Sequence, residues 1–363
     1  MKIERLEISP YRIPTDRPEA DGTLHWDATT LVLVEAIADS GLRGLGYTYS
    51  TAAAGRLIQD LLTKEVIGRP VEQIGAAWQA MVRAVRNVGE RGVAATAISA
   101  IDVALWDLRA RAAEMPLFHL LGTYRDHAPI YGSGGFTTYT EKELVEQLNN
   151  WVGQGISKVK MKVGKDWGTK FEEDLKRVRT VHKTVGSDVE IFVDANGAYT
   201  VKQALDFARR VQELGVTYFE EPVPFDRLDQ LAFIRQQSPI AIASGEYGYN
   251  ASDFRDVLEA RAVDILQADA TRCLGITGCL QAASLAYAFG VPFSTHTAPS
   301  IHAHIGCVVP QIEHLEYFHD HVRIENMLFE GVLQPKEGYL RPDANRPGLG
   351  LELKTNDAER WRI

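Results

Sequence analysis

Two lysines that alternate along one short segment are the first residues whose pattern suggests chemistry. Residues 158–164 read KVKMKVG. Side chains alternate across a strand, so Lys160 and Lys162 share one face and the apolar residues between them share the other. If the apolar face packs on helices, both ammonium groups point into a sheet or barrel interior, where an unpaired charge costs several kcal/mol and anionic partners are required. A surface strand with a solvated lysine stripe is the alternative that this segment alone leaves open.

Titratable residues also stand at the ends of the strand-like segments that follow. The seven residues are Lys162, Asp194, Glu220, Glu246, Asp269, His296 and Glu316. Loops are polar, so one such residue would be unremarkable. A succession of them indicates a site on one rim of a closed barrel.

Three of these residues have the chemistry of a metal site. Asp194, Glu220 and Glu246 would repel one another unless a cation lay between them. An all-oxygen set with room for water suits Mg²⁺ or Mn²⁺, and zinc is disfavoured because the trio contains no His or Cys. Asp269 and His296 follow neighbouring strands, where the carboxylate can orient the imidazole and raise its basicity. The pattern predicts a divalent cation beside a proton-transfer dyad.

The elements that must position these residues alternate from about residue 128 onward. Strand-like segments, each followed by helical sequence, are 129–133, 158–163, 189–194, 217–220, 240–244, 264–268, 292–295 and 312–317. Such units predict a parallel (β/α) barrel with catalytic groups at the carboxyl ends of its strands. An open doubly wound sheet is the alternative, weakened because no dinucleotide-binding glycine pattern follows the early strands.

The first 125 residues follow a different pattern. Residues 2–12 and 29–38 alternate like strands, and residues 56–125 are helical in pattern. Polar loops are expected at 15–26 and 47–55. The loops carry His25, Trp26 and Tyr47, which we predict to contact substrate, although packing back on the core would explain these aromatic residues as well.

Composition and charge narrow the class of protein. The chain has 363 residues with 45% hydrophobic content, enough for a barrel-sized domain and a smaller one. A formal charge of -9 argues against nucleic acid or an anionic membrane as a partner. Three cysteines without CxxC spacing suit a reducing cytosol, and the N-terminus has no apolar run of signal length. We therefore expect a cytoplasmic protein.

Together with several short motifs, these residues resemble the enolase superfamily and, within it, the mandelate racemase subgroup. The resemblance is carried by Ala104-Leu105-Trp106-Asp107, Lys160-x-Lys162, Asp194-Ala195-Asn196, Glu220-Glu221-Pro222, Gly245-Glu246, Asp269 with Arg272, Gly275-Ile276-Thr277, His296 and Pro347-Gly348-Leu349-Gly350. It spans nearly the whole chain. The muconate-lactonising subgroup is disfavoured because it places a lysine after the sixth barrel strand, where this chain has Arg272.

The resemblance implies an architecture and a set of partners. An N-terminal α+β capping domain, residues 1–125 completed by about 331–363, would cover a (β/α)₇β barrel, residues 126–330. A small-molecule carboxylate would be the substrate, and we expect a homo-oligomer.

The resemblance also implies roles for individual residues. Mg²⁺ would be bound by Asp194, Glu220 and Glu246, and a proton α to a carboxylate would be abstracted. Lys162 would be one acid/base group and His296, oriented by Asp269, the other, on opposite faces of the substrate. Lys160 would support the substrate carboxylate, Asn196 would contact oxygen atoms on the metal side or a hydroxyl, and Glu316 would donate to the developing enediolate. The positive field of the cation and Lys160 should lower the pKa of Lys162.

Dehydration of an acid sugar, an aldonate or aldarate, to a 2-keto-3-deoxy acid is the reaction that we favour. The expected lid is rich in hydrogen-bonding groups, whereas a pocket for an aromatic 2-hydroxy acid should be mainly apolar. A racemase or epimerase of a 2-hydroxy acid is the nearest alternative. A non-catalytic sugar-acid binding protein is more distant, because Lys162, Asp269 and His296 are all present.

Overall fold

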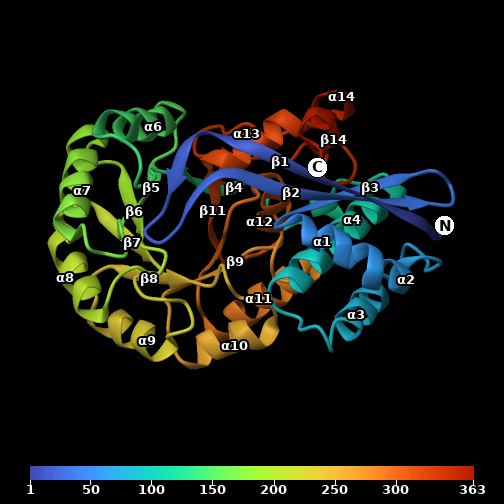
Figure 1. Ribbon diagram of the computed structural model, residues 1–363, viewed down its shortest axis with the longest axis horizontal. Helices are drawn as coiled ribbons and strands as arrows, with labels where there is room; N and C mark the ends of the chain where they lie inside the picture. The colour runs from blue at the N-terminus through green and yellow to red at the C-terminus, as the bar shows by residue number, and fades with distance from the viewer.

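Parallel strands closed into a barrel form the larger part of the computed structural model, which describes residues 1–363 (Figure 1). The strands are β4 (Ala128–Gly134), β5 (Lys158–Lys162), β6 (Glu190–Asp194), β7 (Val216–Glu220), β8 (Ala241–Ser244), β9 (Ile265–Ala268), β10 (Phe293–Thr295) and β11 (Ile312–Phe318). They pair in chain order, and β11 returns to β4 through Leu315 and Ile130.

Helices connect successive barrel strands and cover the outside of the barrel. They are α6 (Glu141–Gly153), α7 (Phe171–Val185), α8 (Val201–Val211), α9 (Leu228–Gln237), α10 (Ala251–Glu259), α11 (Gly275–Phe289) and α12 (Pro299–Gly306), and α13 (His319–Leu328) follows β11. Seven strand-helix units thus precede the last strand. The predicted (β/α)₇β architecture is confirmed, and an open doubly wound sheet is excluded because the sheet closes.

Strand β5 explains why this barrel has a charged interior. Val159 and Met161 are fully buried in the main hydrophobic core. Lys160 is fully buried on the other face, with its ammonium 5.3 Å from the centre of the Tyr131 ring. Lys162 lies at the end of the same strand and is 6% exposed. The alternative of a solvated lysine stripe is therefore wrong, and both ammonium groups must find anionic partners inside the barrel.

A three-stranded antiparallel sheet forms the core of the smaller part of the molecule, with strands β1 (Ile3–Ala20), β2 (His25–Ala38) and β3 (Arg43–Tyr49). It packs on α4 (Val93–Ala112), most of which is buried. The shorter helical elements beside it are α1 (Ala52–Leu57), a π-helical turn at Ile58–Leu62, α2 (Thr63–Val66), α3 (Ile74–Ala84) and α5 (Leu117–Leu121).

Strands β1 and β2 form a hairpin that reaches from the cap across the barrel (Figure 1). The loop predicted at 15–26 is therefore mostly strand, with only residues 21–24 left as the turn. Pairing between the two strands is irregular from Pro14 to Glu19 and resumes at the pairs Glu19–Trp26 and Ala20–His25. The loop predicted from residue 47 begins three residues too early, since β3 runs to Tyr49.

The hairpin turn docks on loops at the carboxyl ends of the barrel strands. A Cβ added to Gly22 would lie 2.6 Å from the Ala195 carbonyl oxygen and 2.8 Å from that of Val163, so only glycine allows this approach. The Trp167 amide donates to the Gly22 carbonyl at 2.9 Å. The cap thereby brings its own side chains to the mouth of the barrel.

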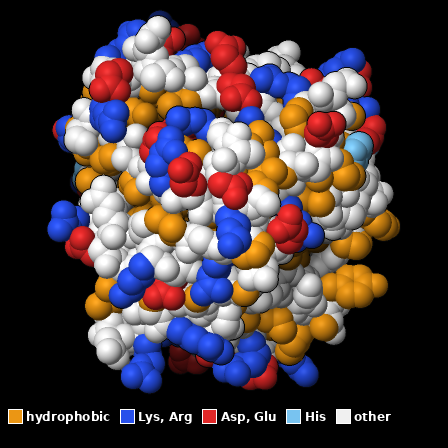
Figure 2. Space-filling model, turned by 90° about the vertical axis from the view of Figure 1, so that its right-hand side faces the viewer, with side chains coloured by type: hydrophobic (Ala, Val, Ile, Leu, Met, Phe, Trp, Pro, Cys, Tyr) orange, Lys and Arg blue, Asp and Glu red, His pale blue; other side chains and the backbone are white.

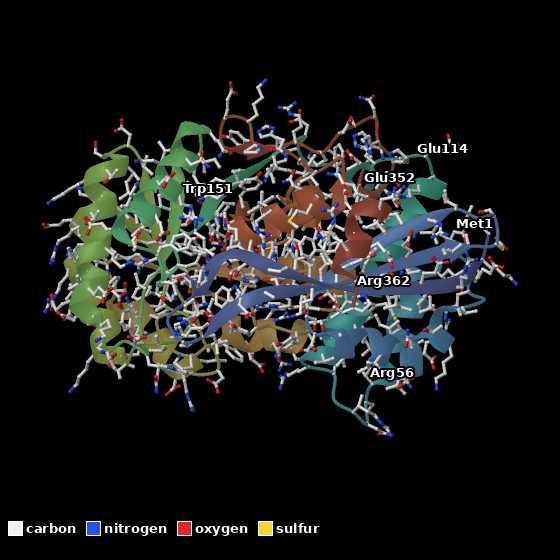
Figure 3. The ribbon with its side chains drawn as sticks, turned by 45° about the horizontal axis from the view of Figure 1, so that its top comes forward. Met1, Arg56, Glu114, Trp151, Glu352 and Arg362 are labelled. Atoms are coloured by element: carbon white, nitrogen blue, oxygen red, sulfur yellow. The ribbon has the colours of Figure 1, made fainter.

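The C-terminal segment passes back from the barrel to the cap. It contains β12 (Phe329–Glu330), which pairs with β14 (Glu352–Leu353), then α14 (Thr355–Ala358) and a 3₁₀ turn at Glu359–Trp361, while β13 (Tyr339–Leu340) pairs with β4. Arg362 lies beside the long N-terminal strands (Figure 3), and the Ile363 amide donates to the Pro10 carbonyl at 3.1 Å.

The surface and the cysteines give less information about function. On the face formed by the cap, acidic and basic side chains are interspersed with apolar ones (Figure 2). No helix combines the length and apolar character needed to span a bilayer. Cys273, Cys279 and Cys307 are all buried free thiols.

Candidate active site

A cavity of about 450 Å³ lies where the cap meets the mouth of the barrel. This volume falls within the range of about 300–1,000 Å³ that is usual for small-molecule sites. The cap contributes Asp21, Leu24, Trp26, Ala28, Thr29, Thr30, Tyr49 and Ser50 to its lining. The barrel contributes Lys162, Asn196, Glu246, Tyr247, Arg272, His296, Thr297, Glu316 and Phe318, and α13 contributes His321.

Three buried carboxylates converge at the barrel end of this cavity. Asp194 and Glu220 are the last residues of β6 and β7, and Glu246 lies two residues beyond the end of β8. Each offers one oxygen, and the three oxygens lie within 4.8 Å of one another. Adjacent parallel strands produce this convergence because Asp194 and Glu220 are direct partners in the ladder.

These side chains fit a hard divalent cation. Glu220 Oε1, Glu246 Oε2 and Asn196 Oδ1 are buried and have no hydrogen-bond partner within the protein. Burial, together with the neighbouring Asp194 carboxylate, raises the pKa of Glu220 well above its usual range. A cation among these oxygens would satisfy them and favour the ionised carboxylates. The acidic triad could thus hold Mg²⁺, as the sequence predicts.

Lys160 binds the carboxylates from inside the barrel and does not line the cavity. Its Nζ donates to Glu220 Oε2 at 2.6 Å, and lies 2.7 Å from Glu316 Oε1 and 3.4 Å from Asp194 Oδ2. Burial lowers the pKa of Lys160, but the carboxylates around it outweigh burial and raise the pKa well above its usual value. Lys160 lies in the middle of β5 and is not among the residues that line the cavity, so its contact with a substrate carboxylate stays a prediction. Its contacts in the structure hold acidic side chains in place.

Lys162 does line the cavity, at the end of β5. Its Nζ donates to Asp194 Oδ2 at 2.5 Å. Burial lowers the pKa of Lys162, but the adjacent Asp194 charge outweighs burial and raises the pKa above its usual value. The sequence predicts that a bound cation and Lys160 lower the pKa of Lys162. The protein groups alone raise this pKa instead, because the Asp194 carboxylate is closer to Lys162 than any cationic group.

His296 and Asp269 form a dyad that follows β10 and β9. His296 Nδ1 lies 2.8 Å from Asp269 Oδ2, and the Thr271 amide donates to Asp269 Oδ1 at 2.7 Å. Burial raises the pKa of Asp269, but His296 and Arg272 outweigh it and hold the pKa well below its usual range. Because the carboxylate accepts from Nδ1, Nε2 is the ring nitrogen left to face the site, where Glu246 Oε2 lies 3.3 Å away.

Glu316 accepts hydrogen bonds at both oxygens. Ser133 Oγ donates to Oε1 at 2.6 Å, and the Thr297 amide donates to Oε2 at 2.9 Å. Burial raises its pKa, but Lys160 and His296 outweigh burial and hold the pKa well below the usual range. Glu316 lines the cavity, and its hydrogen bond to a developing enediolate stays a prediction because it requires the protonated carboxyl.

Of the three aromatic residues predicted to contact substrate, only Trp26 lines the cavity. Its Nε1 donates to Glu19 Oε2 at 2.8 Å, and its ring packs edge to face on Phe136. His25 is exposed outside the cavity, because side chains alternate along β2. Tyr47 is fully buried, donates to Glu325 Oε1 at 2.6 Å and stacks on Phe329, so it belongs to the contact between cap and barrel.

Several lining residues were not identified from the sequence. Tyr247 and Thr297 directly follow Glu246 and His296, so extending the strand-end argument by one residue would have found both. Arg272 donates to Glu246 Oε1 at 3.2 Å, and its guanidinium lies over the Tyr247 ring. His321 lies on the helix after β11 and stacks on Tyr49, and no local pattern indicates it.

Comparison with known proteins gives matches over both parts of the chain. Residues 143–358 match the family described as enolase C-terminal domain-like, and residues 13–122 match the N-terminal domain of mandelate racemase / muconate lactonizing enzyme. An arabinonate dehydratase of Saccharolobus solfataricus is 30% identical over 92% of this chain and 90% of its own length. A D-galactarolactone cycloisomerase of Agrobacterium fabrum is 29% identical over 100% of this chain and 99% of its own.

Solved structures agree with these sequence matches. A mandelate racemase/muconate lactonizing enzyme-like protein from Rubrobacter xylanophilus superimposes with a TM-score of 0.97 and 47% identity over 100% of both chains. A racemase from Streptomyces coelicolor with bound magnesium has a TM-score of 0.94 and 29% identity over 99% of this chain and 100% of its own. An L-talarate dehydratase from Polaromonas, complexed with Mg and L-glucarate, has a TM-score of 0.90 and 29% identity over 100% of this chain and 97% of its own.

Proposed function

Because this chain belongs to the mandelate racemase/muconate lactonizing enzyme family of the enolase superfamily, we propose that it dehydrates an acid sugar to a 2-keto-3-deoxy acid. The relatives described above include an arabinonate dehydratase and an L-talarate dehydratase. The observation that carries the proposal is the arrangement of two proton-transfer groups and an acidic triad around one cavity. Lys162 ends β5 and His296 follows β10. These strands are separated by β4 and β11 on one side and by four strands on the other, so the two groups approach a ligand from different directions.

Asp194, Glu220 and Glu246 would hold the cation, which we take to be Mg²⁺ with Mn²⁺ as a substitute. When bound, the ion would supply positive charge beside the substrate carboxylate and beside Asp194. The neutral amine of Lys162, which lies at the cavity wall, takes the proton from carbon 2 and becomes an ammonium. The electron pair of that C–H bond passes to the carboxylate side of the substrate.

His296 completes the reaction from the other side. Its Nε2 gives a proton to the hydroxyl on carbon 3, the C3–O bond breaks, and water leaves. The product is an enol, which takes up a proton at carbon 3, loses the proton of the hydroxyl on carbon 2 and becomes the 2-keto-3-deoxy acid. Asp269 supports this step because its hydrogen bond to Nδ1 fixes the ring and its tautomer.

Free polar atoms around the cavity favour a polyhydroxylated substrate. Tyr49 Oη and Asn196 Oδ1 are buried without a protein partner, and both residues line the cavity. Buried polar groups are costly unless a ligand or water satisfies them. Substrate hydroxyls would satisfy these atoms, whereas the ring of an aromatic 2-hydroxy acid would leave them unpaired.

The test is an incubation of the Mg²⁺-loaded protein with a panel of aldonic and aldaric acids. Semicarbazide trapping should detect an α-keto product from at least one acid, and NMR in D₂O should show the loss of the carbon-2 proton. Lys162→Ala should abolish the product. Lys165→Ala, a change in a half-buried side chain that lies outside the cavity and pairs with Glu173, should not. Inversion at carbon 2 without keto acid from any member of the panel would favour the racemase instead.

Cycloisomerisation is a second candidate, favoured by the D-galactarolactone cycloisomerase that matches this chain over its whole length. It begins with the same proton transfers at the α-carbon, so the residues above serve both reactions. Sugar-acid lactones and anhydro acids added to the panel distinguish the two, because a cycloisomerase would consume these and leave the open-chain acids unchanged.

We further propose a homo-oligomeric cytoplasmic enzyme whose cap, residues 1–125, is completed by residues 331–363. The hydrogen bond from Ile363 to Pro10 supports the second part. Exposed aromatic side chains on α9 and α11, among them Phe233 and Tyr287, offer a surface for contact between subunits. Light scattering of the purified protein measures the oligomeric state.

A further inference from the structure

We infer that the cavity selects a sugar acid with one carboxylate, an aldonate, and discriminates against the aldarate that carries a second carboxylate at its far end. This inference rests on the proposed function, because it takes one carboxylate of the substrate to lie at the acidic triad. It concerns the other end of the molecule, which must lie against the cap.

The permanent cations that line the cavity are already paired with protein carboxylates. They are Lys162 and Arg272. Lys162 Nζ is 2.5 Å from Asp194 Oδ2. Arg272 Nη1 is 3.2 Å from Glu246 Oε1, and Arg272 Nε is 3.7 Å from Asp269 Oδ2. Both cations therefore belong to the triad and the dyad at the barrel end, and a carboxylate against the cap finds neither of them free.

The two histidines that line the cavity do not supply a cation for the cap side either. His296 is held between Asp269 and Glu246, with Nδ1 at 2.8 Å from the first and Nε2 at 3.3 Å from the second. His321 accepts the Ala298 amide at Nδ1 and stacks on Tyr49, with ring centres 3.3 Å apart. His321 is buried, with 8% of its surface exposed, and burial favours the neutral imidazole.

The cap wall adds one negative charge and several neutral hydroxyls. Asp21 is the one carboxylate that the cap contributes to the lining, and the cap contributes no cationic side chain to it. Its Oδ1 accepts from the Thr23 amide at 2.5 Å and the Leu24 amide at 2.8 Å, which fixes the carboxylate in the hairpin turn. Thr29, Thr30, Tyr49 and Ser50 supply the hydroxyls.

The charges and hydroxyls of the cap wall favour an aldonate, which ends in a hydroxymethyl group, over an aldarate, which ends in a carboxylate. A terminal hydroxymethyl group is neutral, and the hydroxyls of the cap can replace the water that it loses. A terminal carboxylate would be desolvated beside Asp21 with no unpaired cation to compensate, which disfavours binding of the dianion. The specificity therefore comes from repulsion by Asp21 as well as from the lack of an available partner.

The experiment compares acids that share every stereocentre and differ only at the last carbon, such as gluconate with glucarate and galactonate with galactarate. For the best configuration, kcat/KM of the Mg²⁺-loaded enzyme should be at least tenfold higher for the aldonate. Asp21→Asn, which keeps the oxygen that accepts the turn amides, should raise kcat/KM for the aldarate more than for the aldonate. Asp27 is an exposed residue of the same hairpin and lies outside the cavity. Asp27→Asn should therefore leave the ratio of kcat/KM for aldonate and aldarate unchanged.

Binding separates this inference from the proposed reaction. Calorimetric titration of Mg²⁺-loaded Lys162→Ala with the same pairs reports affinity without turnover, and the aldonate should bind at least tenfold more tightly. If no acid yields keto product but this preference holds, the proposed function fails and the selectivity stands. Equal or tighter binding of the aldarate, or binding of neither acid, overturns the inference. If Asp21→Asn has the same ratio of kcat/KM for aldonate and aldarate as the wild type, Asp21 does not set the preference, and its proposed role is overturned.

Discussion

Replacement of Lys160 by methionine tests whether this lysine holds the metal ligands in place. The side chain is fully buried, and its ammonium lies 2.6 Å from Glu220, 2.7 Å from Glu316 and 3.4 Å from Asp194. Methionine has a similar length and no charge, so the change removes the cation with little change in packing. The three carboxylates would remain, buried and without this partner.

The expected loss is large for a single substitution. Breaking a buried ion pair by removing one partner costs about 3–5 kcal/mol. Unfolding entropy is about 2.1 cal/mol/K per residue, or roughly 0.8 kcal/mol/K for this chain, so the melting temperature should fall by about 4–7 °C. Mg²⁺ should recover part of the loss, because a cation at the triad replaces some of the missing positive charge.

Calorimetry or thermal fluorescence with EDTA and with Mg²⁺ measures this shift. Lys158→Met is the matched control, because Lys158 lies on the same strand but is 26% exposed and forms longer ion pairs with Glu190 and Glu313. Such pairs are worth about 0–1 kcal/mol, so the control should shift by no more than about 1 °C. A Lys160→Met protein that melts within 1 °C of the control, and whose main defect is a raised KM, would show that Lys160 binds the substrate and would refute the reasoning.

Three further predictions concern the metal, the dyad and pH. EDTA should abolish turnover and lower the melting temperature, by about 3–4 °C relative to a sample with Mg²⁺ at 100 times its Kd, and full activity after metal removal would contradict the site. Asp269→Asn should lower kcat by roughly 10²–10⁴-fold with the fold retained, because the amide no longer fixes the His296 tautomer; an unchanged kcat in stopped assays would exclude the dyad. Burial raises the pKa of Glu325 from 4.5 to about 7, so the folded state binds this proton more tightly and stability should fall as pH rises from about 4.5 to about 7, by up to about 3 kcal/mol. Glu325→Gln should flatten that slope in urea titrations, and an identical slope would assign the pH dependence to other groups.

The barrel and its rim could be predicted because they follow from a local rule. Apolar and polar residues alternate in short segments, helices lie between the segments, and carboxyl ends of parallel strands share one edge. Lys162, Asp194 and Glu220 therefore lie where the sequence placed them, each as the last residue of its strand. The metal triad needs only this rule and the mutual repulsion of carboxylates.

The cap residues could not be predicted in the same way, because their positions depend on contacts between distant segments. Tyr47 and Tyr49 are two residues apart on β3, yet Tyr47 is bound to Glu325 and Tyr49 lies at the cavity against His321. Their roles are decided by α13, nearly three hundred residues later in the chain. The alternation along β5 correctly predicts that Lys160 points into the barrel. Whether its ammonium reaches the cavity depends on the acidic side chains of the other strands, which the pattern of one strand does not contain.

The balance of charge at the barrel mouth connects the metal to the choice of substrate. Six carboxylates here are at least 98% buried, and three fixed cations, Lys160, Lys162 and Arg272, lie beside them. The carboxylates are Asp194, Glu220, Glu221, Glu246, Asp269 and Glu316. Carboxylates therefore outnumber the fixed cations, and a divalent cation would offset part of the excess. A second substrate carboxylate would lie beside Asp21 with every cation of the site already engaged, so the requirement for a metal and the preference for a monocarboxylate follow from the same set of buried charges.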